Sequence, residues 1–231
     1  MLKLQKKIDI YYKIYYNYKK DKIMSALRDI QIIPWIFKYN TRIFFETGTG
    51  LGSGLMRMIQ PEYGQELLIS CDIDKDLAEH SQRTFSFDTR VLIINDEGPN
   101  VLENLLPKIP LNKPIFFWLD SHFANSDYNL GHKPLVKHSE GDAEIRLPAL
   151  NELRIIKRLR TDLGAKDFIL LDDAMLYDEL DRYEDSVARL GPNAVPPEYR
   201  KIIGKATEIF KDTHTPQVLT IAQGFFALHP R

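Results

Sequence analysis

Acidic side chains and a histidine close two strongly apolar runs of the sequence. One run ends in Asp120-Ser-His122, and another ends in the pair Asp172-Asp173. If both runs are neighbouring strands of a parallel sheet, their carboxyl ends lie at the same edge. Carboxylates packed that closely are costly unless a proton or a cation neutralises them. Because oxygen ligands suit a hard divalent ion such as Mg²⁺, Asp120, Asp172 and Asp173 are predicted metal ligands.

A glycine-rich turn follows another apolar run, Arg42-Ile-Phe-Phe-Glu-Thr-Gly-Thr-Gly-Leu-Gly-Ser-Gly54. Glycine lets the backbone approach a ligand closely and adopt positive φ, so the turn can curl under a cofactor. The spacing differs from the dinucleotide pattern Gly-x-Gly-x-x-Gly. Glu46, at the end of the strand, would repel a pyrophosphate and attract a cationic ligand. A plain loop remains the alternative.

The next apolar run, Glu66-Leu-Leu-Ile-Ser-Cys-Asp72, ends in an acid 26 positions after Glu46. A strand-helix-strand unit places a ribose-binding acid at about this distance, so Asp72 is the predicted ribose ligand. Asp74 is an alternative ligand. Asp72 could instead be the N-cap of the helix expected from Lys75 to Arg83.

The pattern Glu46-x-Gly48-x-Gly50-x-Gly resembles the first motif of the class I methyltransferases that use S-adenosylmethionine (SAM). SAM carries a sulfonium and an ammonium group and no phosphate. The resemblance implies that Glu46, Gly48, Gly50 and Asp72 bind SAM. It also implies that Asp96, after the apolar run Arg90 to Asn95, accepts a hydrogen bond from the adenine amine, whereas the residues alone are equally compatible with an ordinary turn.

One branch, the macrocin O-methyltransferase type, has Asp-x-Asp after strand four and Asp-Asp after strand five. In that branch the acids bind a divalent metal, and the second acid of the first pair resembles a general base. When this motif is aligned with the present sequence, the metal ligands correspond to Asp120, Asp172 and Asp173. His122 stands at the position of the general base. Histidine can accept a proton near neutral pH, so His122 and Asp120 are the candidate catalytic residues. The alternatives are helix caps for the acid pair and a strand-end hydrogen bond for the histidine.

A second similarity covers the same stretch. Uncharacterised methyltransferase-like proteins have Leu-Asp-x-His after strand four, then Pro-x-Leu-x-Glu-Leu, then an acidic pair. This chain has Leu119-Asp-Ser-His122, Pro148-Ala-Leu-Asn-Glu-Leu153 and Asp172-Asp173. These relatives do not define a substrate.

The elements that position these residues alternate between apolar strands and helix-like stretches. Five apolar runs, each ending in acid or glycine, predict an α/β fold with a doubly wound, mostly parallel sheet. Residues 217–222 and 224–228 predict an antiparallel hairpin turning at Gln223. A last antiparallel strand beside the fifth resembles the seven-stranded methyltransferase sheet and not the dehydrogenase sheet.

Residues 121–147 form a long polar stretch that we expect to cover the substrate as a lid. His132 and His138 are too far apart for a short metal-binding motif. Lys133, Lys137, His138 and Arg146 could meet an anionic substrate group, although a solvated loop is the alternative.

Residues 1–40 are predicted to be a basic, tyrosine-rich helical extension before a domain at 41–231. This extension has eight lysines and one arginine against three aspartates, and six of the 11 tyrosines. Leu4, Ile8, Tyr11, Tyr15 and Tyr18 recur at helical spacing, and Pro34 is expected to end the helical region. The extension could pack on its own domain or form a homo-oligomer, and an acidic remainder argues against nucleic-acid binding.

Composition agrees with one domain: the chain has 231 residues, of which 44% are hydrophobic and 27% charged. We expect no signal peptide and no membrane span. The single cysteine, Cys71, cannot form an internal disulfide, so a cytoplasmic location is expected.

The resulting hypothesis is SAM-dependent methylation of a hydroxyl on a small molecule, such as a sugar or natural product, with possible help from Mg²⁺. A noncatalytic adenosine-binding or scaffold protein is the alternative, and an NAD-dependent dehydrogenase is the third candidate.

Overall fold

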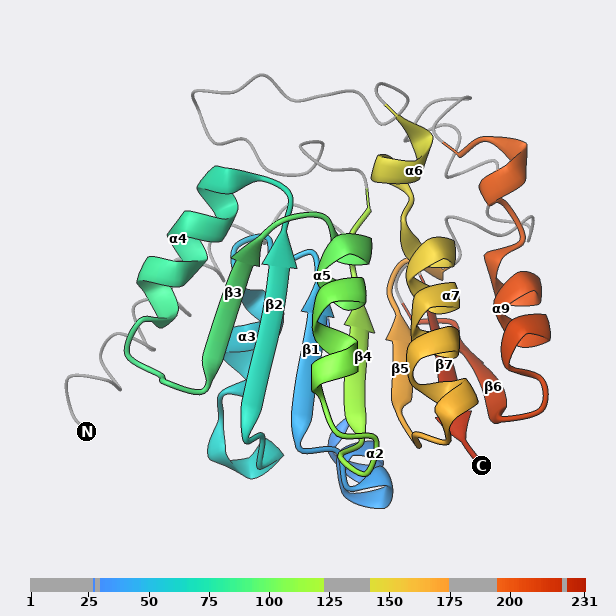
Figure 1. Ribbon diagram of the computed structural model, residues 1–231, viewed down its shortest axis with the longest axis horizontal. Helices are drawn as coiled ribbons and strands as arrows, with labels where there is room; N and C mark the ends of the chain where they lie inside the picture. The colour runs from blue at the N-terminus through green and yellow to red at the C-terminus, as the bar shows by residue number, and fades with distance from the viewer. Residues whose placement is uncertain (1–26, 28–29, 123–141, 175–194, 222–223) are drawn as a thin grey trace.

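A seven-stranded sheet lies between two layers of helices (Figure 1). The structure is a computed structural model that describes residues 27, 30–122, 142–174, 195–221 and 224–231. The strand order is β3-β2-β1-β4-β5-β7-β6, in which β1 to β5 are parallel and β7 is antiparallel to both β5 and β6. The strands are β1 (Ile43–Thr47), β2 (Leu67–Asp72), β3 (Val91–Asn95), β4 (Ile115–Leu119), β5 (Phe168–Leu171), β6 (His214–Leu219) and β7 (Phe225–Pro230). The predicted doubly wound sheet and its antiparallel hairpin are confirmed.

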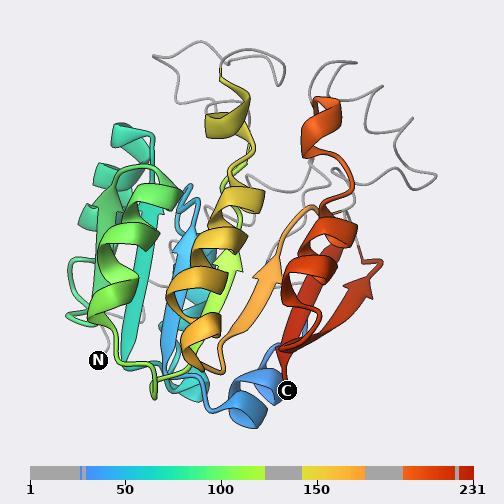
Figure 2. The same ribbon diagram turned by 45° about the vertical axis from the view of Figure 1, so that its right-hand side comes forward.

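Within the described ranges, three helices cover each face of the sheet. Figures 1 and 2 show α5, α7 and α9 side by side on one face, with bounds Gly98–Leu105, Ala149–Leu159 and Ile202–Phe210. The opposite face packs against α2 (Ile33–Tyr39), α3 (Ser53–Met58) and α4 (Lys75–Phe85). A short helix, α6 (Ala143–Arg146), precedes α7, and 3₁₀ turns occur at Pro61–Tyr63, Leu106–Lys108, Thr161–Leu163 and Pro197–Tyr199.

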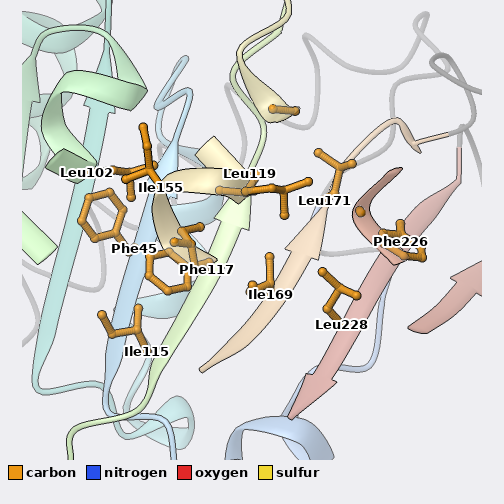
Figure 3. Close-up of a cluster of buried hydrophobic side chains, with 14 of the residues drawn as sticks. Phe45, Leu102, Ile115, Phe117, Leu119, Ile155, Ile169, Leu171, Phe226 and Leu228 are labelled. Atoms are coloured by element: carbon orange, nitrogen blue, oxygen red, sulfur yellow. The ribbon is translucent and has the colours of Figure 1, made fainter. Parts of the chain in front are cut away.

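Strand β4 explains why the central runs are continuously apolar. Phe117 and Leu119 face the core beneath α5 and α7, whereas Phe116 and Trp118 face the core beneath α2 and α3. Each of these four side chains is at most 1% exposed. A parallel strand covered on both faces has no polar face to alternate with, so the sequence shows an unbroken hydrophobic run. Figure 3 shows the first of these cores, with Phe45, Phe117 and Ile169 in one layer.

The segment before β1 differs from the prediction. Pro34 lies in the first turn of α2 and so begins a helix. A proline is tolerated there because the first backbone N–H groups of a helix have no partner within it. Ile32 and Ile36 are buried against the sheet, and the Arg57 guanidinium donates to the backbone oxygens of Leu27 and Ile30. Residues 1–26, and with them the tyrosine stripe, lie outside the described residues.

The hairpin strands lie further toward their outer ends than predicted: β6 is His214–Leu219 where 217–222 was predicted, and β7 is Phe225–Pro230 where 224–228 was predicted. β6 begins at His214 and includes Pro216, which an edge strand tolerates because one side of its backbone is unpaired. The predicted turn at Gln223 lies outside the described residues. In the described ranges, no helix is both long enough and apolar enough to cross a membrane.

A buried ion pair lies at the amino end of the sheet. The guanidinium of Arg160 donates to both carboxylate oxygens of Asp167, at 2.9 and 3.0 Å, and both side chains are completely buried. Asp167 also accepts from the backbone N–H of Ile115 at 2.8 Å. This pair ties the start of β5 to the start of β4 and to the end of α7.

His214 packs beside this pair and should make stability depend on pH. Burial lowers the pKa of His214 from 6.5 to about 4. Between pH 6.5 and pH 4, His214 is therefore protonated in the unfolded chain but neutral in the folded chain. The free energy of unfolding should fall as the pH drops from about 6.5 to about 4. The loss should reach at most roughly 3 kcal/mol.

Urea denaturation of the wild type and His214→Gln across this pH range would measure the effect. The glutamine variant cannot titrate there, so its stability should change less with pH. Parallel pH profiles for the two proteins would contradict this explanation.

Candidate functional site

The glycine-rich turn after β1 is held against the end of β2. The backbone N–H groups of Gly48 and Thr49 donate to the Cys71 oxygen at 2.9 and 3.0 Å. Gly48, Gly50 and Gly52 have φ of 83°, 51° and 78°, which side chains other than glycine rarely adopt. The expected tight turn is therefore present.

Gly48 also marks the closest approach between two strand ends. A Cβ at this position would lie 2.4 Å from the backbone oxygen of Asp120. The β1 turn thus packs directly on the end of β4, where the strand order reverses from β1-β2-β3 to β4-β5. Ligands of open α/β sheets bind at such a switch point.

Asp72 connects the turn to β2. Its Oδ2 accepts from the Gly50 N–H at 2.8 Å, and its Oδ1 accepts from the Asp74 N–H at 2.8 Å. Asp74 is the N-cap of α4, because its Oδ1 accepts from the N–H groups of Asp76 and Leu77. The structure therefore assigns the capping role to Asp74 and leaves Asp72 at the rim beside the glycines.

Glu46 lies beneath the turn and is 1% exposed. Its Oε2 accepts from the Ser70 hydroxyl at 2.6 Å, which in turn lies 2.6 Å from the Thr49 hydroxyl. A Cβ at Gly54 would lie 1.9 Å from Glu46 Oε1, so glycine at the start of α3 makes room for this carboxyl. Burial raises the pKa of Glu46 to about 8. Without a nearby cation, this carboxyl is therefore mostly protonated at neutral pH.

Asp96 lies at the end of β3, next to α5. Its Oδ1 accepts from the Glu97 N–H at 2.7 Å and from the Asn100 side chain at 3.1 Å. The side chain is partly exposed. Asp96, Asp72 and the glycine turn therefore follow one another along the rim in the strand order β3, β2, β1.

The ends of β4 and β5 bring His122 and Asp173 together. His122 Nε2 lies 2.9 Å from Asp173 Oδ2, and His122 Nδ1 lies 3.7 Å from Asp120 Oδ1. In the tautomer with the proton on Nε2, His122 would donate this hydrogen bond to Asp173. Asp173 has φ of 49°, an uncommon conformation that aims its side chain at the end of its strand.

Asp120 and Asp172 repel each other at the rim. The pKa of Asp120 lies well above its usual value because surrounding protein atoms desolvate it and the Asp172 carboxylate repels its charge. Asp120 still has 29% of its side-chain surface exposed, whereas Asp172 is 1% exposed as a residue. Asp172 Oδ1 accepts from the Asp173 N–H at 2.8 Å.

The predicted three-carboxylate metal site is not formed by the described residues. Among them, no three histidine, cysteine or acidic side chains lie close enough to hold one ion. Asp173 Oδ2 instead lies 2.9 Å from His122 Nε2. The Asp120 and Asp172 carboxyls repel each other electrostatically, and Mg²⁺ is commonly bound by one or two carboxylates with waters completing its shell. The oxygen ligands of Asp120 and Asp172 therefore fit a Mg²⁺ site with two carboxylates.

The sequence interpretation gave no role to Glu152, although it noted the motif Pro148 to Leu153. Glu152 lies on α7, is completely buried, and accepts a hydrogen bond from the Ser121 hydroxyl at 2.7 Å. Burial raises its pKa to about 7. The sequence signal that could have identified Glu152 is an acid within the largely apolar motif Pro148 to Leu153. The lid prediction falls mostly on residues 123–141, which lie outside the described residues.

Comparisons with known proteins support the fold. No protein-family model matches the sequence, and no curated protein matches it. Solved structures do match over nearly the whole chain. PaMTH1 from Podospora anserina, a methyltransferase solved with bound S-adenosylhomocysteine (SAH), is 15% identical, with 97% of this chain and 88% of that chain covered and a TM-score of 0.56.

Two O-methyltransferases are similar in the same way. The enzyme from Bacillus cereus, solved with SAH, is 11% identical, with coverage of 98% and 91% and a TM-score of 0.57. TomG from Streptomyces achromogenes, an enzyme of tomaymycin synthesis solved with SAM, is 12% identical, with coverage of 97% and 89% and a TM-score of 0.54. The chain has the class I methyltransferase fold. Among proteins of this fold, these similar structures include O-methyltransferases.

The contact between Gly48 and Asp120 can be tested by Gly48→Ala. The new Cβ would combine an unfavourable positive φ with a collision against backbone atoms, so we expect a loss of roughly 2 to 5 kcal/mol in the free energy of unfolding. Gly164→Ala is the matched control, because Gly164 has φ of 93° but no atom within 4 Å of the added carbon. Denaturant unfolding of both variants measures the difference. An equal loss at the two positions would refute the close approach.

Proposed function

We propose that the protein is a SAM-dependent methyltransferase that transfers a methyl group to a hydroxyl of a small molecule, such as a sugar or natural product. The observation that carries the proposal is the hydrogen bond between Gly50 N–H and Asp72 Oδ2 at 2.8 Å. It joins a positive-φ glycine turn to an acid at the next strand end, beside the switch point. Solved proteins of this fold that hold SAM or SAH support this assignment.

In this proposal the cofactor lies along the rim. Asp96 receives the adenine amine, Asp72 the ribose hydroxyls, and the turn at Gly48 and Gly50 approaches the rest of the molecule. The enzyme would hold the acceptor oxygen in line with the sulfonium methyl, so that binding supplies much of the rate enhancement.

His122 is the proposed proton acceptor. With a proton on Nε2 donated to Asp173, Nδ1 would accept the proton of the acceptor hydroxyl. Asp173 thereby orients the imidazole and stabilises its positive charge after proton transfer. Asp120, 3.7 Å from Nδ1, would border the position of the acceptor oxygen.

Asp120 and Asp172 are the residues that would hold a divalent ion. When bound, such an ion would lower the pKa of the acceptor hydroxyl. The charge of the ion would also relieve the repulsion between the two carboxylates.

Two other functions remain candidates. A noncatalytic protein that binds adenosine compounds would share the Asp72 site and lack turnover. An NAD-dependent dehydrogenase is disfavoured by the antiparallel position of β7 beside β5.

Calorimetric titration with SAM and, separately, NAD tests the cofactor. We expect SAM to bind and NAD not to bind. Asp72→Asn should weaken SAM binding at least about tenfold, which corresponds to about 1.4 kcal/mol. Glu79→Gln, an exposed acid on α4, serves as the control and should bind like the wild type. Binding of NAD, or of neither compound, would refute the proposed function.

A radiolabelled methyl-transfer assay across hydroxyl-bearing acceptors then separates the enzyme from the noncatalytic binder.

Metal binding is tested separately with Mn²⁺, whose free form is counted by electron paramagnetic resonance. We expect the wild type to bind Mn²⁺, Asp172→Ala to bind it at least about tenfold more weakly, and the exposed-acid control Asp162→Ala to be unchanged. No binding by the wild type would remove the metal from the proposal and leave methyl transfer standing.

A further inference from the structure

Glu152 is a buried acid at the site to which the proposed mechanism gives no role. Its side chain reaches from α7 to the end of β4, where Ser121 donates to Oε1 at 2.7 Å. The second oxygen, Oε2, is buried and has no hydrogen-bond partner in the described part of the chain. No lysine or arginine in those ranges forms an ion pair with it. A buried carboxyl with one oxygen unsatisfied is costly, and such groups concentrate at functional sites.

The surroundings of Glu152 are built to admit the carboxyl. A Cβ at Gly98 would lie 2.1 Å from Oε1, so only glycine fits at the start of α5. The N–H groups at the beginning of this helix favour a negative charge. Thr47 of β1 lies close enough to lower the pKa of Glu152, although its hydroxyl does not reach hydrogen-bond geometry. The titratable groups that face Glu152 are His122, beyond Ser121, and the Cys71 thiol of β2.

The sheet order places Glu152 relative to the proposed cofactor. With adenine at Asp96 on β3 and ribose at Asp72 on β2, the remaining part of SAM extends over β1 and β4. That part carries the sulfonium. Glu152 lies below the same strand ends, in contact with Ser121. In a low-dielectric interior, a buried carboxylate attracts a nearby cation much more strongly than it would in water.

We propose that Glu152 is the buried counter-charge of the sulfonium, so that the site binds the cationic methyl donor in preference to its neutral product. This inference rests on the proposed function. In methyl transfer the acceptor oxygen forms a bond to the methyl carbon while the S–CH₃ bond breaks, and its electron pair remains on sulfur. The sulfonium thereby becomes an uncharged thioether, and the hydroxyl proton passes to His122. SAH therefore lacks the charge that Glu152 attracts, which favours its release.

The burial of Glu152 supports this role. A pKa of about 7 means that a modest attraction to a cation suffices to ionise the group at neutral pH. Ser121 and the start of α5 stabilise the ionised form. A group with an ordinary pKa would remain ionised with either ligand and would retain an unpaired charge in the product complex.

The test compares the dissociation constants of SAM and SAH for three proteins at pH 7.5 by calorimetry. We expect Glu152→Gln to weaken SAM binding at least about fivefold and to change SAH binding less than about twofold. Glu103→Gln, an exposed acid on the neighbouring helix α5, is the control and should leave both constants unchanged. Thermal melting of each protein verifies folding.

Ser121→Ala gives a second route if the glutamine variant does not fold. It leaves Glu152 in place but removes the donor that stabilises its ionised form, so SAM affinity should fall and SAH affinity should not. Equal weakening of both ligands in these variants would show a purely structural role and overturn the inference. Unchanged binding of both would overturn it as well. Failure of the wild type to bind either ligand would instead refute the proposed function.

Discussion

The convergence of acidic side chains at one edge of a parallel sheet is the constraint that the rest of the structure accommodates. Parallel strands bring their carboxyl ends together, and here each of the central strands ends at or near an acid. Acids at the two ends of the strands have different kinds of partner. At the amino edge, Asp167 has a buried arginine partner. At the carboxyl edge, Glu46, Asp72 and one oxygen of Glu152 accept hydrogen bonds from hydroxyls or backbone N–H groups. Among the described residues, no arginine or lysine forms an ion pair with Glu46 or Glu152 at that edge.

The sheet could be predicted because its central strands are buried on both faces and their sequence is continuously apolar. The antiparallel hairpin was recognisable for the same reason, although its outer strand was not delimited. β6 is exposed over Thr215 to Val218 and contains Pro216, so its first half lacks the usual strand pattern. The α2 segment was misjudged because proline is compatible with both the first turn and the end of a helix. Only packing of Ile32 and Ile36 decides between them.

The site was predicted where a residue's position along the chain determines its location, and missed where packing determines it. Acids at strand ends must lie at the rim, so Asp72, Asp120 and Asp172 were identifiable. The contact between His122 and Asp173 depends on the relative register of β4 and β5, which no local pattern encodes. Glu152 belongs to a helix, and the depth of a helical side chain depends on the neighbours that cover it.

Two glycines that make room for carboxyls have a consequence for sequence divergence. Gly54 lies against Glu46, and Gly98 lies against Glu152, each so closely that a methyl group would displace the acid. The members of each pair are therefore not free to change independently. In related chains, a side chain at position 98 should accompany a shorter or uncharged residue at position 152, and the same coupling should join positions 54 and 46. Covariation at these positions would thus record steric exclusion between a backbone and a buried charge.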